Sequence, residues 1–134
     1  MVILRMEGLD MANRLRFVVE TFDHEAWVDR VFLARVGGDE FVILIRSPDV
    51  REVANDIANE IHKCLQPIHR IGLNDVQAVA SIGIALNGPE YQNAQELLRD
   101  ADVAMYEAKA NGPEQTYHCT AEMRSMALAR LDLE

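Results

Sequence analysis

Apolar and polar residues follow two different periods along this chain. Compact apolar runs rich in β-branched and aromatic residues predict strands, and they cover residues 1–4, 31–36, 41–45, 76–86 and 116–119. Apolar residues spaced three and four apart predict helices over 48–66, 94–111 and 120–134, with one or two more within 11–30. Strands that alternate with helices around an antiparallel pair predict an α/β (α+β) fold with a central mixed sheet flanked by helices.

The strongest local signal is a hairpin between the second and third predicted strands. Gly37 and Gly38 separate the two apolar runs. A glycine pair supplies the positive φ that a two-residue hairpin turn needs, so we expect such a turn here. Two acidic residues, Asp39 and Glu40, directly follow it.

Several helix ends are marked by capping residues. Ser47 followed by Pro48 predicts an N-cap and a first helical residue. Asn93 with Glu96 three residues later predicts a capping box. Gly112 is typical of the residue that follows the last turn of a helix.

Composition and charge narrow the class of protein. The chain has 134 residues, of which 49% are hydrophobic, and a formal net charge of −9. We expect a single domain with a real core and no binding to nucleic acid polymers, whose phosphates require a basic surface. The sequence contains no apolar run of about 18 residues or more and no basic-then-apolar leader, so we expect no membrane insertion. The two cysteines form no CxxC pair, which favours a cytoplasmic location.

Spacing alone leaves two interpretations of Asp39 and Glu40 open. Acidic residues at a hairpin tip are commonly solvated charge, and spacing by itself favours this interpretation. Alternatively, the glycines admit a phosphate or a metal ion to the backbone, and the carboxylates bind a hard cation such as Mg²⁺.

Three motifs together resemble one family. Residues 35–41, Arg-Val-Gly-Gly-Asp-Glu-Phe, resemble the signature of the GGDEF family, the diguanylate cyclases that condense two GTP molecules into cyclic di-GMP. Residues 81–85 are similar to a later strand of that family, and residues 97–109 are similar to its late helix. The motifs occur in the family's order, and the resemblance covers most of residues 1–119.

The resemblance implies a fold related to nucleotidyl cyclase palm domains, with GTP lying over the sheet. Mg²⁺ or Mn²⁺ neutralises the phosphates while a ribose 3′-hydroxyl attacks an α-phosphate, and two domains face each other during catalysis. The resemblance assigns catalysis and metal binding to Asp39 and Glu40, with the Met6 backbone carbonyl as a further metal ligand. It assigns nucleotide binding to Gly37, Gly38, Asn13 and Lys109.

The sequence also departs from the family pattern. When the chain is aligned on Asn13, Arg5 occupies the position of a metal-binding Asp. A guanidinium cannot coordinate a cation and repels it. Glu7 shares the strand face of Arg5 and is a candidate substitute ligand. Pro113 stands where the family has a phosphate-binding Arg, and the stretch between Asn13 and Gly37 lacks the family's Gly-His-x-x-Gly-Asp segment.

These departures favour a catalytically impaired GGDEF domain over residues 1–119 that acts as a regulatory GTP-binding or dimerisation module in cyclic di-GMP signalling. One alternative is an active diguanylate cyclase in which Glu7 replaces the missing Asp. Another is a protein-interaction scaffold without a nucleotide. Residues 120–134 resemble the connector to an EAL phosphodiesterase domain, and the abrupt apolar start indicates that preceding residues are missing. The expected partners are therefore a second GGDEF domain, an adjacent EAL domain and an upstream sensor.

Overall fold

The computed structural model describes residues 2–7, 16, 20, 30–37, 40–65, 69–71, 74–76, 80–112 and 115–133. Its elements follow the order β1 (Val2–Glu7), β2 (Arg30–Arg35), β3 (Glu40–Arg46), α2 (Val50–Leu65), β4 (His69–Ile71), β5 (Asn74–Val76), β6 (Ser81–Leu86), α3 (Ala94–Ala110), β7 (Thr116–His118) and α4 (Ala121–Leu133).

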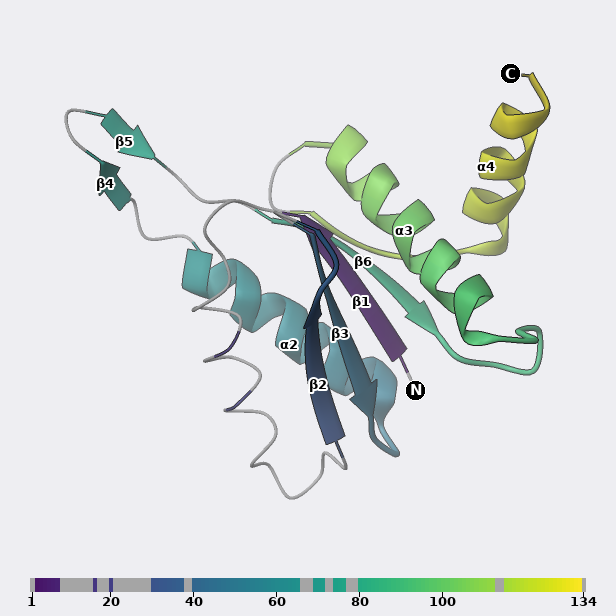
Figure 1. The fold of residues 1–134 in the computed structure, drawn as a ribbon, viewed down its shortest axis with the longest axis horizontal. Helices are drawn as coiled ribbons and strands as arrows, with labels where there is room; N and C mark the ends of the chain where they lie inside the picture. The colour runs from purple at the N-terminus through teal and green to yellow at the C-terminus, as the bar shows by residue number, and fades with distance from the viewer. Residues whose placement is uncertain are drawn as a thin grey trace.

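The strands form a mixed five-stranded sheet in the order β2-β3-β1-β6-β7. Strand β1 lies at its centre and pairs antiparallel with both β3 and β6. Strands β2 and β3 form the predicted hairpin, and β7 adds parallel to β6 at the other edge. Strands β4 and β5 form a separate two-stranded sheet that projects from the main body (Figure 1). The predicted α/β fold with a central mixed sheet is confirmed.

Helices cover the two faces of the main sheet, with α2 on one face and α3 on the other (Figure 1). Successive residues of a strand point to opposite faces, and β3 shows this directly. Its residues Phe41, Ile43 and Ile45 join the core under α2, whereas Val42 joins the core under α3. The largest fully buried side chains belong to these layers: Ile43, Ile45, Ile57, Ile61, Ile82 and Ile84.

Gly83 lets α3 approach the sheet closely. A Cβ atom at this position of β6 would collide with the carbonyl oxygen of Ala101 and the backbone nitrogen of Met105, and would lie 2.8 Å from the Cα of Met105. Only a residue without a side chain fits between this strand and the helix backbone. The glycine therefore sets the distance between the sheet and the helix that carries Lys109.

The structure corrects several local predictions. The connection between β2 and β3 covers residues 36–39, so it is longer than the predicted two-residue turn, and Gly37 does not have a positive φ. Helix α2 begins at Val50 rather than Pro48, and the backbone carbonyl of Asp49 accepts its first intrahelical bond, from Val53 at 3.1 Å.

The predicted strand over 76–86 is divided, because β5 ends at Val76 and β6 begins at Ser81. The first strand extends to Glu7, beyond its predicted end. The helices predicted within 11–30 lie almost wholly outside the described residues. Two residues of this stretch, Arg16 and Glu20, are described as helical. At the other end of the chain, Gly112 has a φ of 116° directly after α3, as its predicted role requires.

Candidate functional site

The strand directions bring the ends of three strands together at one edge of the sheet, here called the hairpin edge. Glu7, the last residue of β1, lies opposite Glu40 at the start of β3 and opposite Ser81 at the start of β6. Met6 lies opposite Phe41. Directly paired residues of antiparallel strands have Cα atoms roughly 4.5–5.5 Å apart. The backbone of Met6 and Glu7 is therefore immediately beside the first residues of β3.

Backbone and side-chain hydrogen bonds fix the hairpin at this edge. The carbonyl oxygen of Glu40 accepts from the backbone nitrogens of Val36 at 2.9 Å and Gly37 at 3.3 Å. The Arg35 Nε donates to the carbonyl oxygen of Gly37 at 3.1 Å, and its guanidinium lies 5.4 Å from the centre of the Phe41 ring. Arg35 thus holds the start of the loop, a role that the sequence did not assign to it.

Lys109 lies at the same edge of the molecule. It occupies the last turn of α3, where a positive charge suits the negative end of the helix dipole. From α3 the chain reaches β7, whose first residue, Thr116, pairs with Ile82 near the start of β6. Figure 1 shows this end of α3 above the edge at which β1 ends and β3 begins.

The predicted site residues are described to different extents. Gly37 and Lys109 are exposed and Glu40 is half-buried, whereas the backbone alone is described for Met6 and Glu7. Asn13, Gly38 and Asp39 lie outside the described residues, as does Pro113. The structure thus brings Met6, Glu7, Gly37 and Glu40 to one edge by register, with Lys109 at the adjoining helix end. Within the described ranges, no group of three or more His, Cys, Asp or Glu residues is placed to hold a metal ion.

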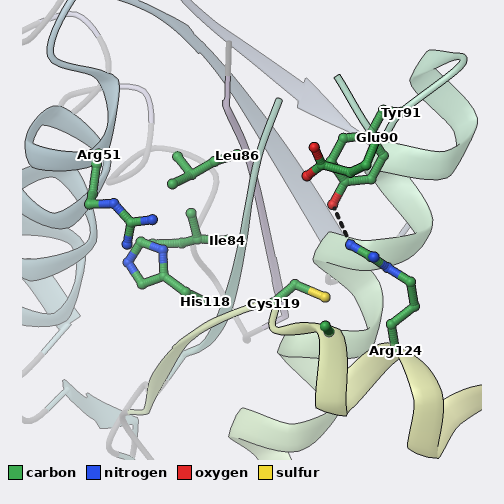
Figure 2. A pocket seen from close by; sticks show the side chains of 9 residues that line it. Arg51, Ile84, Leu86, Glu90, Tyr91, His118, Cys119 and Arg124 are labelled. Carbon is green, nitrogen blue, oxygen red and sulfur yellow. Dashed lines mark hydrogen bonds between the residues drawn. The ribbon is translucent and has the colours of Figure 1, made fainter. Parts of the chain in front are cut away.

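A second polar cluster, which the sequence did not predict, joins α3 to α4. Figure 2 shows two of its members, Tyr91 and Arg124. Asp100 of α3 is fully buried, and its Oδ2 accepts hydrogen bonds from the Tyr91 hydroxyl at 2.6 Å and the Arg124 Nε at 2.8 Å. The Arg124 Nη2 lies 2.6 Å from the same oxygen and donates to the Tyr91 hydroxyl at 3.1 Å. The Arg99 Nε lies 3.6 Å from the other carboxylate oxygen. Tyr91, Asp100 and Arg124 are called the Asp100 cluster below.

The charges of this cluster follow from its contacts. Burial disfavours the charged form of Asp100, but hydrogen bonds from Arg124 and Tyr91 outweigh it and hold the pKa of the carboxyl below its ordinary value. Burial, with the hydrogen bond and charge of Asp100, raises the pKa of Tyr91 to about 12. The hydrogen bond to Asp100 also raises the pKa of Arg124. At neutral pH the cluster is therefore an ion pair capped by a neutral tyrosine.

One sequence signal could have revealed Asp100. The predicted apolar stripe of the late helix includes Leu97, Ala101 and Ala104, and Asp100 lies three residues after the first and four before the last. Positions three and four apart share a helix face, so the stripe itself places this carboxylate in the core. A buried carboxylate requires a partner, and Arg124 supplies it.

A cavity of about 280 Å³ lies beside the Asp100 cluster, at the end of β6 that is remote from the hairpin edge (Figure 2). Tyr91 and Arg124 lie on one side of it and Arg51 and His118 on the other, with Ile84 and Leu86 between them. Arg124 therefore borders this open space as well as contacting Asp100.

Two histidines hold β7 against α2. The Nε2 of His62 is 2.7 Å from the Thr116 hydroxyl, and the Nε2 of His118 is 2.7 Å from the Asn55 side-chain oxygen. Burial and the charge of Arg51 lower the pKa of His118, which favours the neutral ring. Both histidines therefore act in the packing of β7 against α2.

Comparisons with known proteins agree with the fold. The family described as "Diguanylate cyclase, GGDEF domain" matches residues 12–115. The chain is 34% identical over 125 residues to the bifunctional diguanylate cyclase/cyclic di-GMP phosphodiesterase MucR of Pseudomonas aeruginosa, covering 93% of this chain and 17% of MucR. It is 36% identical over 102 residues to the cyclic di-GMP phosphodiesterase PdeR of Escherichia coli, covering 76% of this chain and 15% of PdeR.

Solved structures show the same architecture. The GGDEF domain of YfiN (TpbB) from Pseudomonas aeruginosa matches with a TM-score of 0.74 and 23% identity, over 95% of this chain and 81% of that one. An EAL/GGDEF domain protein from M. capsulatus matches with a TM-score of 0.67 and 25% identity, over 89% of this chain and 84% of that one.

The mixed sheet, with its hairpin beside the central strand, defines an α/β domain with the architecture of solved GGDEF domains. With the family match over residues 12–115, the chain belongs to the GGDEF diguanylate cyclase domain family. It spans less than a fifth of the length of MucR and PdeR. Across the described part of the chain, no helix has the length and apolar character needed to cross a membrane.

Proposed function

We propose that this chain is the GGDEF domain of a cyclic di-GMP signalling protein, that it binds GTP with a divalent cation, and that it turns GTP over poorly. It acts as a regulatory or dimerisation module. The observation that carries the proposal is the position of Arg5. Arg5 lies in the central strand β1, opposite Val42 and Gly83 and two residues before the hairpin edge. When the sequence is aligned on Asn13, the resemblance places the family's metal-binding Asp at this residue.

Arg5 impairs the chemistry for an electrostatic reason. An arginine is charged at every accessible pH and has no lone pair to offer a metal ion. Its charge can offset part of the charge on the phosphates, but it cannot lower the pKa of the attacking hydroxyl. Substrate binding is therefore retained more readily than turnover.

Nucleotide binding is supported by the residues that remain at the hairpin edge. Gly37 carries no side chain on the exposed loop, and Arg35 holds its carbonyl group. Lys109 is exposed at the adjoining end of α3 and would act as a point charge toward the terminal phosphates. Asn13 and Gly38 complete the proposed nucleotide site, as the family's pattern implies.

The donor groups at this edge suit a hard cation. Carboxylate and carbonyl oxygens are the ligands that Mg²⁺ and Mn²⁺ prefer. The Glu40 carboxylate and the Met6 carbonyl would hold the ion, together with Asp39 and with Glu7 as the substitute for the missing Asp. When bound, such an ion supplies charge neutralisation at the phosphates.

Calorimetric titration of the chain with GTP, with and without Mg²⁺, tests binding, and a cyclic di-GMP assay tests turnover. We expect Mg²⁺-dependent GTP binding with little or no product. Glu40→Gln should weaken binding, whereas the control Glu90→Gln should not, because Glu90 is an exposed carboxylate beside the remote cavity. An absence of GTP binding at high Mg²⁺ would instead support the scaffold alternative.

A working diguanylate cyclase is the second candidate, and one observation favours it. Glu7 lies directly opposite Glu40 in the β1–β3 register, so the substitute carboxylate belongs to a residue beside the signature. If this candidate is right, the wild type makes cyclic di-GMP at a measurable rate and Glu7→Gln abolishes product formation. Robust turnover by the wild type would overturn the proposal of an impaired domain.

The curated relatives suggest the wider setting. MucR is described as both a diguanylate cyclase and a cyclic di-GMP phosphodiesterase, and this chain corresponds to 17% of it. We propose that the chain works within a longer protein, beside an EAL phosphodiesterase domain and a sensor. A second copy of the domain would be its partner in any catalysis, since each domain holds one GTP.

A further inference from the structure

Helix α4 is attached firmly at its first turn. The backbone nitrogen of Cys119 donates to the carbonyl oxygen of Ile84 at 2.8 Å, which continues the pairing of β7 with β6. The Thr120 hydroxyl then accepts from the backbone nitrogen of Met123 at 3.1 Å and caps the helix. These contacts fix where α4 begins, but they do not fix the direction in which it runs.

Among residues 121–129, the part of α4 whose side chains the structure describes, no apolar side chain is fully buried. The principal neighbour of α4 among the described elements is α3. Met123 and Ala127 are half-buried, whereas Met126 and Leu128 are 48% and 51% exposed. Over residues 121–129, the orientation of α4 therefore rests more on polar contacts than on apolar burial.

The Asp100 cluster supplies such contacts. Arg124 lies one turn into α4 and reaches back to a carboxylate that is fully buried in α3. The Nε and Nη2 of Arg124 and the Tyr91 hydroxyl all contact the same oxygen of Asp100, Oδ2. A buried carboxylate that loses its charged partner is strongly unfavourable, so Asp100 retains Arg124 and with it the first turns of α4.

We propose that the Asp100 cluster is the joint that sets the angle between α4 and the rest of the domain, with Arg124 as its positioning residue. When the joint opens, α4 leaves α3 as one unit while the sheet and α2 stay folded. Arg124 also lines the cavity of about 280 Å³, so there is open space next to the joint. The inference concerns the end of the domain remote from the hairpin edge and does not depend on nucleotide binding.

Amide hydrogen exchange on the full 134-residue chain, resolved by NMR, tests this proposal. Local opening and global unfolding are separated by comparing amides of α4 with amides of α2 under the same conditions. In Arg124→Gln we expect protection of the α4 amides beyond Met123 to fall by about tenfold or more, with protection in α2 lowered much less. Equal losses in both helices, or no loss in α4, would overturn the proposal.

Two further variants keep the test specific. Arg99→Gln is the matched control, because it removes an arginine that lies 3.6 Å from the same carboxylate but belongs to α3 itself. It should leave α4 protected, and a loss in α4 equal to that of Arg124→Gln would contradict the joint. Tyr91→Phe removes the two hydrogen bonds of the hydroxyl, to Asp100 and from Arg124, without removing a charge, so it should lower α4 protection by a smaller factor. It also provides the measurement if Arg124→Gln does not fold.

Discussion

Substitution of Gly83 by alanine tests the closest contact in the fold. The added Cβ would lie 2.8 Å from the Met105 Cα and would collide with the backbone of Ala101 as well. The obstructing atoms belong to the helix backbone, so a change of rotamer cannot relieve the clash. Helix α3 would have to move away from the sheet, and its buried stripe would lose contacts along its length.

The magnitude follows from two opposing effects. Forcing an extra methyl group into a packed interior costs about 1–3 kcal/mol, and a clash with backbone belongs at the upper end of that range. Alanine is favoured over glycine within a strand by roughly 0.5–1 kcal/mol, which offsets part of the cost. We expect a net loss of about 2 kcal/mol in the free energy of unfolding.

Urea denaturation followed by circular dichroism measures this loss, with a lower midpoint and an unchanged slope. Gly37→Ala is the matched control, because its Cβ would meet its nearest neighbour, the Glu40 Cβ, at an ordinary 3.7 Å. The control should lie within about 0.5 kcal/mol of the wild type. A Gly83→Ala chain as stable as Gly37→Ala would refute the close approach of α3 to β6.

Three other measurements test the surroundings of the Asp100 cluster and the hairpin edge. The folded-state pKa of Asp100 lies below its unfolded value of about 3.9, so the ionised carboxylate stabilises the fold above that pH. This stabilisation is lost as the pH falls through the folded-state pKa, so the free energies of unfolding of the wild type and Asp100→Asn should converge in acid. Burial and the charge of Asp100 raise the pKa of Cys119 to about 11, so its thiol should react far more slowly with iodoacetamide at pH 8 than a free cysteine, as mass spectrometry would show. At the hairpin edge, Lys109→Ala should weaken GTP binding more than GMP binding in calorimetry, and equal losses would contradict a contact with the terminal phosphates.

The sequence predicted best those features whose physical cause is local. The N-cap of α3 is an example, because the Asn93 side chain accepts from the backbone nitrogen of Glu96 at 3.0 Å, as the spacing implied. The Glu96 carboxylate reaches the backbone nitrogen of Gln92 rather than that of Asn93. The predicted hairpin formed for a related reason, since two β-branched runs joined by a short loop have few other ways to pair.

Features that depend on distant residues were predicted less well. The largely apolar character of residues 76–86 gave no sign that β5 pairs with β4 while β6 joins the main sheet. The register of β1 could not be predicted from its own apolar pattern, because a strand at the centre of a sheet is positioned by both neighbouring strands. That register places Glu7 opposite Glu40, so it decides how close the substitute carboxylate comes to the signature.

Asp100 shows how a departure from a pattern can be more informative than the pattern. A carboxylate inside an apolar helical stripe is costly to bury, so the stripe implied a cationic partner elsewhere in the chain. The partner is Arg124, 24 residues away on the helix that follows β7. The same helix α3 carries Lys109 in its last turn, at the hairpin edge. Helix α3 therefore runs from the contact that holds α4 to the candidate nucleotide site, and Gly83 fixes its distance from the sheet.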